Sequence, residues 1–171
     1  MTTAGSCTVI DGSDSSWGRS TYKLYSTNKD PEDHYLHFDG KSNSLKADGD
    51  GMNNAKFKIH KTVDNQEETI VILEHKESGK VMAINTQNDK VTLEDPPVSL
   101  SQLTNGGIDM SHPEILFHKK WWRPGREWFY LKSLLDGPDR FVKFENDGTP
   151  TGTTDITKAS LFRADCVENS S

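Results

Sequence analysis

The feature that most constrains this chain is a pattern that occurs three times along it. Residues 34–59, 80–119 and 140–165 each read as an alternating strand, a polar turn, a short second strand, a loop and a further strand. The last strand of each copy is centred on a phenylalanine, namely Phe57, Phe117 and Phe162. The repeat predicts an all-β chain of many short strands in three similar units. Closing such strands into a barrel would remove exposed sheet edges.

Two further strand candidates, 69–75 and 127–134, lie between the copies. The middle copy is longer than the other two because of an insertion over 96–113, PPVSLSQLTNGGIDMSHP. Its proline, glycine and serine content is typical of loops that run over the surface. We therefore expect this insertion to be a surface loop.

The charge of the chain is unevenly distributed. The net charge of −6 and the pI near 5.5 argue against a general nucleic-acid or heparin binder, which is usually basic. Residues 118–132, however, carry five lysines and arginines against one glutamate, and hold three of the four tryptophans. This aromatic and basic segment is therefore a candidate binding surface.

Motifs for metal or catalytic chemistry are weak. The acidic stretch 48–51 resembles a calcium loop, but the position that should supply its final carboxylate is Ile59. The six histidines lack zinc-ligand spacing, and no nucleophile elbow frames a serine. We expect no enzyme activity, no metal and no cofactor.

The segment KSLLDGPDRFVKF resembles the signature of the interleukin-1 family, with Ser133, Leu134, Pro138 and Phe141 in the matching places. One residue is inserted before Pro138 relative to that signature. Further pieces are similar to the family's strands in the same order, beginning with CTVID at 7–11 as the first strand. The resemblance implies a β-trefoil, which the threefold repeat also favours. We expect one domain over 1–171 with an ordered core of about 6–166.

The resemblance also implies a function. It is that of a secreted, proinflammatory cytokine that binds an immunoglobulin-like receptor ectodomain and recruits an accessory receptor chain. The N-terminus has no secretory signal pattern, so we expect a cytosolic precursor pool and an extracellular protein released by unconventional secretion. A monomer is expected, with neither nucleic-acid binding nor membrane insertion. Agonist and antagonist roles both stay open.

The candidate receptor contacts come from three places. Adjacent residues of a strand point to opposite faces, so one of the two neighbouring indoles in 118–132 should face outward amid cations. The resemblance adds the family's acidic loop near 63–69 and its first strand. The resulting set is Lys119, Trp121, Trp122, Arg123, Asp64, Glu67, Glu68, Thr8, Ile10 and Asp11.

Two other trefoil functions compete with the cytokine reading. One is a fibroblast-growth-factor-like protein that binds a receptor and a sulfated glycan, but few cations lie in the last repeat where that site would be. The other is a trefoil inhibitor or lectin, although the Gln-x-Trp motif of such lectins is absent. The fold would bring Cys7 and Cys166 near each other, and we expect both to be free thiols.

Overall fold

Twelve β-strands run through the part of the chain that the structure describes. The structure is a computed structural model, and it describes residues 20–26, 35–39, 44–49, 55–63, 66, 68–85, 87–103, 108–122, 128–145 and 147–169. The strands are β1 (Ser20–Ser26), β2 (Tyr35–Asp39), β3 (Ser44–Gly49), β4 (Lys56–Val63), β5 (Thr69–His75), β6 (Val81–Ile84), β7 (Val91–Glu94), β8 (Phe117–Trp121), β9 (Phe129–Ser133), β10 (Phe141–Phe144), β11 (Pro150–Thr153) and β12 (Phe162–Asn169).

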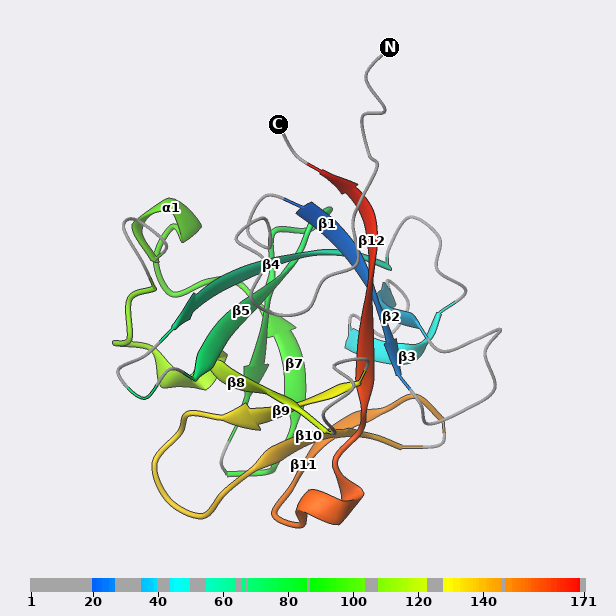
Figure 1. Cartoon of the computed structure of the whole chain (residues 1–171), viewed down its shortest axis with the longest axis vertical. Coiled ribbons are helices and arrows are strands. Elements are labelled where there is room, and N and C mark those ends of the chain that lie inside the picture. The colour runs from blue at the N-terminus through cyan, green and yellow to red at the C-terminus, as the bar shows by residue number, and fades with distance from the viewer. Residues whose placement is uncertain are drawn as a thin grey trace.

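Six of these strands close into a ring. The strands β1, β4, β5, β8, β9 and β12 are each antiparallel to the next, and β12 pairs with β1 again. Both views show β1 and β12 side by side, although they come from opposite ends of the chain (Figure 1). A closed ring leaves no unpaired barrel edge for another chain to extend.

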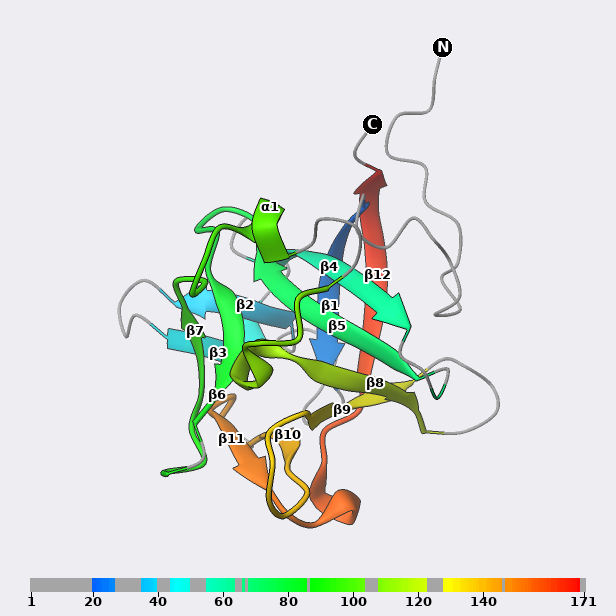
Figure 2. The same cartoon turned by 90° about the vertical axis from the view of Figure 1, so that its left-hand side faces the viewer.

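The other six strands form three hairpins that meet at one end of the barrel. The hairpins are β2–β3, β6–β7 and β10–β11. Backbone pairing links the hairpins to one another. The Ala47 N–H in β3 donates to the Gly148 carbonyl over 2.8 Å, and Lys90 forms an antiparallel β-bridge with Thr151 of β11. Figure 2 shows the hairpins on the left and lower side, away from the upper ends of β1 and β12. This arrangement of a barrel and three hairpins is a β-trefoil.

The repeat predicted from the sequence is the repeat of the structure. Phe57, Phe117 and Phe162 are fully buried in the main core and take equivalent places in β4, β8 and β12. Their cross-strand partners, His75, Ser133 and Ser26, are each the last residue of a barrel strand and are also buried. Burying each phenylalanine ring contributes roughly 1.5–3 kcal/mol. The turn that joins β9 to β10 contains Gly137, whose φ of +108° lies in the region that favours glycine.

The place of the first barrel strand differs from the expectation. Ser20–Ser26 fills it, pairing with both β12 and β4, whereas the family resemblance put the first strand at 7–11. Residues 7–11 lie outside the described residues. The segment STYKLYS was missed because it carries few strongly apolar residues, although Tyr22 and Leu24 alternate inward into the main core.

The insertion in the middle unit is more than the surface loop that its composition predicted. It contains the one-turn helix α1 (Leu100–Leu103), and a 3₁₀ turn (Pro113–Ile115) follows it. Leu103 is 0% exposed and packs with Ile70, Ile72 and Val81 in a second hydrophobic cluster. Val71 and Leu73 face the main core instead. Both faces of β5 are therefore covered, which explains why its apolar run is continuous rather than alternating.

Helix is scarce in the described part of the chain. Besides α1 there are two 3₁₀ turns, the second over Ile156–Lys158, where the Asp155 carboxylate accepts from the Thr157 amide over 2.9 Å. None of the helices there is long and apolar enough to cross a membrane. Cys7 lies outside the described residues, so the expected free-thiol pair stays a prediction.

Candidate functional site

The β8–β9 hairpin separates its aromatic and basic residues onto two faces. Trp121 points toward the main core, where its ring meets Phe129 edge-on at 6.1 Å. Trp122 is 39% exposed and meets the outward ring of Tyr130 at 6.1 Å. The two neighbouring indoles therefore point in opposite directions, as the alternation predicted.

Lys119 lies on the inner face. It takes the barrel position that Ile59 and Ala164 take in the other two units, two residues after each core phenylalanine. Its side chain is 5% exposed, and its Nζ lies 3.4 Å from the centre of the Trp121 ring and 4.9 Å from that of Phe129. The cation is held by ring faces inside the barrel, where a docking protein has almost no access to it.

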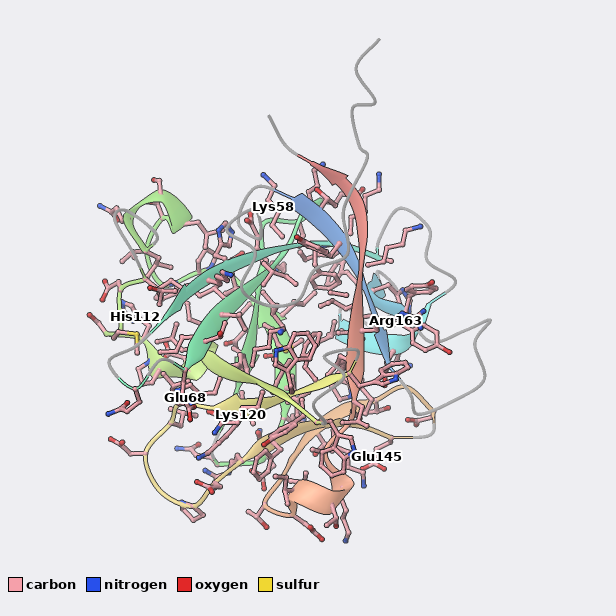
Figure 3. All side chains as sticks on the ribbon, in the orientation of Figure 1. Lys58, Glu68, His112, Lys120, Glu145 and Arg163 are labelled. Atoms are coloured by element: carbon pink, nitrogen blue, oxygen red, sulfur yellow. The ribbon has the colours of Figure 1, made fainter. Side chains whose placement is uncertain are left out.

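Glu68 joins the outer face of β8. Its carboxylate lies 3.2 Å from the Lys120 ammonium and 3.7 Å from His118 Nε2 (Figure 3). The acidic loop and the hairpin are therefore neighbours at this point, as two patches of one binding surface would require. The other sequence-predicted candidates lie outside the described residues, and their roles stay predictions: Thr8, Ile10, Asp11, Asp64, Glu67 and Arg123.

A lateral row of four aromatic rings and one arginine crosses the outer wall of the barrel. Arg163 of β12 pairs with Tyr25 of β1, and Tyr25 pairs with Tyr35 of β2. On the other side of Arg163 stands Trp128, whose carbonyl accepts a hydrogen bond from the Trp122 N–H over 2.9 Å. We call these five residues, Trp122, Trp128, Arg163, Tyr25 and Tyr35, the aromatic row.

Contacts within the aromatic row are close. The Arg163 guanidinium lies 4.9 Å from the Tyr25 ring centre and 5.3 Å from that of Trp128. The ring centre of Tyr25 lies 5.4 Å from that of Tyr35, which it meets edge-on, and 6.1 Å from that of Trp128. Tyr25 is only 8% exposed, so it forms the base of the row. Trp122 is exposed, and Trp128 and Tyr35 are half-buried, so their rings still offer surface to a ligand.

Sequence reasoning found one member of the aromatic row, Trp122, as a site residue. The others come from segments that no local pattern connects, since Tyr25 and Arg163 lie near opposite ends of the described chain. Only the closing of β12 against β1 and β9 brings them together. The one local signal was the unusual number of tryptophans in 118–132.

The chemistry of the aromatic row is that of recognition. Ring faces bind apolar surface and cations, and a guanidinium supplies hydrogen-bond donors in a fixed plane. The row contains no serine, cysteine, histidine, lysine, aspartate or glutamate side chain. Among the described residues, no three His, Cys, Asp or Glu side chains are grouped so as to hold a metal ion.

Comparison with known proteins supports the fold. No family model matches the chain, and no curated protein sequence matches it. Among solved structures, the chain is similar to SeviL bound to the asialo-GM1 saccharide, with 9% identity, a TM-score of 0.57 and coverage of 85% of this chain and 96% of that one. It is also similar to the β-trefoil of BEL, with 10% identity, a TM-score of 0.61 and coverage of 86% and 93%. These likenesses support the β-trefoil fold and give no specific support to the interleukin-1 resemblance.

Proposed function

We propose that this chain is a non-catalytic recognition protein that binds a saccharide on the aromatic row. Sugar rings have faces rich in C–H groups and rims of hydroxyls. The faces pack against aromatic rings, and the hydroxyls accept hydrogen bonds from a guanidinium. The observation that carries the proposal is the row itself, in which Arg163 lies 5.3 Å from the Trp128 ring centre and Trp122, Trp128 and Tyr35 are exposed or half-buried.

Two further features support this proposal. The closed barrel fixes the row through paired strands, so little conformational entropy is lost when a ligand binds. One of the similar trefoil structures was solved with a saccharide bound. Because its identity to this chain is only 9%, it supports the fold, and the proposed ligand class rests on the aromatic row.

Receptor binding of the interleukin-1 type is the second candidate function. It is favoured by the exposed Trp122, two residues after the Lys120 that contacts Glu68, since tryptophan at the centre of an interface often dominates its binding energy. Secretion without a signal peptide and a monomeric state go with this candidate as expectations. Receptor ectodomains therefore belong in the same binding assay as the saccharides.

The proposal predicts that Trp128→Ala lowers saccharide affinity at least about tenfold, equivalent to about 1.4 kcal/mol of binding free energy. The reason is that the aromatic ring that flanks Arg163 is lost. The measurement is retention of labelled protein on an array of neutral, sialylated and sulfated saccharides that includes the asialo-GM1 saccharide. Immobilised interleukin-1-type receptor ectodomains serve as the parallel arm.

The control is Met110→Ala, which removes an exposed apolar side chain from the insertion and should leave array binding unchanged. Thermal melts of both variants show whether the fold is intact. If the wild-type protein is retained by receptor ectodomains and by no saccharide, the saccharide proposal is wrong and the cytokine candidate takes its place.

A further inference from the structure

The threefold symmetry of the barrel creates three equivalent lateral rows on its outer wall. Each row is centred on the residue that follows a core phenylalanine, which is Lys58, His118 or Arg163. All three central residues carry a cationic or protonatable side chain that faces away from the core. The neighbours of these residues on the adjoining strands differ between the three rows, and they decide what each row can bind.

The first row has no aromatic member. Lys58 lies between Thr21 of β1 and Glu74 of β5, and Glu74 pairs with Val81 of β6. Thr21 and Val81 are fully buried. The Glu74 carboxylate is already 2.9 Å from His60 Nε2. This row therefore offers a hydrogen-bonded polar surface, and none of its four residues carries an aromatic ring.

The second row is covered at both ends. His118 lies between Ile70 of β5 and Lys132 of β9, and Lys132 pairs with Phe141 of β10. Ile70 is buried in the cluster beneath the insertion, and Phe141 is only 5% exposed. The Lys132 ammonium lies 3.3 Å from the Asp139 carboxylate. The insertion thus occupies one flank of the row, and the aromatic residue at its other end, Phe141, is buried.

The third row differs at every flanking position. Trp128 takes the position that Thr21 has in the first row and Ile70 in the second. Tyr25 takes the position of Glu74 and Lys132. Tyr35 takes the position of Val81 and Phe141. Among these described positions, exposed ring surface gathers around one central cation, Arg163. Figure 3 shows Arg163 on β12, well apart from Lys58.

We infer that, of the three lateral rows, the aromatic row binds a saccharide and the two pseudo-equivalent rows bind none. This inference rests on the proposed function and adds to it the number of sites among these rows. The described part of the barrel wall then holds a single glycan at a time and does not bridge two of them. Three similar sites would instead raise apparent affinity for a dense glycan surface by multivalency.

The test removes one row at a time and uses the same saccharide array as its probe. Trp128→Ala disables the aromatic row, Lys58→Ala changes the first row and His118→Ala changes the second. With a single site, Trp128→Ala lowers every positive array signal at least about tenfold. Lys58→Ala and His118→Ala each leave the signals within about twofold of wild type, as surface substitutions outside a site usually do.

One result would overturn the inference while leaving the proposed function standing. It is a clear loss of signal in Lys58→Ala or His118→Ala, with melting temperatures unchanged, alongside the loss in Trp128→Ala. A Trp128→Ala protein that keeps most of the wild-type signal would contradict both the inference and the placement of the saccharide on the aromatic row. Failure of the proposed function itself looks different, because the wild-type protein would then be retained by no saccharide on the array.

Discussion

Lys119→Glu is expected to lower the free energy of unfolding by about 3–5 kcal/mol, because it places an unpaired carboxylate inside the barrel. The ring faces of Trp121 and Phe129 that attract the lysine ammonium are electron-rich and repel an anion. For a chain of this size, the melting temperature should fall by on the order of 10 °C. Urea unfolding and a thermal melt measure both quantities.

Lys119→Met is the matched control for this experiment. It keeps a long unbranched side chain under the Trp121 ring and removes only the charge, so the expected loss is about 1–2 kcal/mol from the cation–π contact. A Lys119→Glu protein that melts with the wild type would show that this position is exposed in solution. In that case Lys119 would return to the set of candidate receptor contacts.

Leu103→Ala is expected to cost about 2–5 kcal/mol, because Leu103 is fully buried between the insertion and the outer face of β5. The cavity would lie against Ile70 and Ile72, two apolar side chains on the outer face of β5 that Leu103 packs against. Val98→Ala, at an exposed position of the same insertion, should change stability by less than about 0.5 kcal/mol. Denaturant unfolding of both variants gives the comparison.

Equal stabilities for Leu103→Ala and Val98→Ala would mean that the insertion is a loosely attached loop, as its composition first indicated. The expected difference would instead make the insertion part of the hydrophobic core. Saccharide binding should be unaffected by either change, since the aromatic row lies on other strands.

The hairpins and the core phenylalanines were predictable because they depend on local pattern. Alternation with period two and turn residues such as Gly137 identify strands without knowledge of their partners. The covered outer face of β5 also had a local signal, the unbroken apolar run from Ile70 to Leu73. A continuous apolar run of this kind indicates that both faces of the strand are buried.

The aromatic row was not predictable in the same way. Tyr25, Trp128 and Arg163 become neighbours only through the register of β1, β9 and β12. A shift of one residue in that register would turn these side chains toward the core. The β1 segment was itself missed, so the strand that anchors the row was absent from the expected fold.

The pairing of β1 with β12 has a consequence for synthesis of the chain on the ribosome. Ser20 lies opposite Asn169, so β1 finds this partner only when β12 has emerged. Before β12 emerges, β1 can pair with β4 and β2, but the edge that pairs with β12 stays unpaired. The edge of β9 that pairs with β12 is unpaired as well. Contacts of such long sequence separation form late and expose strand edges meanwhile. The nascent protein therefore keeps these strand edges unpaired until β12 emerges, and the aromatic row forms only with that strand.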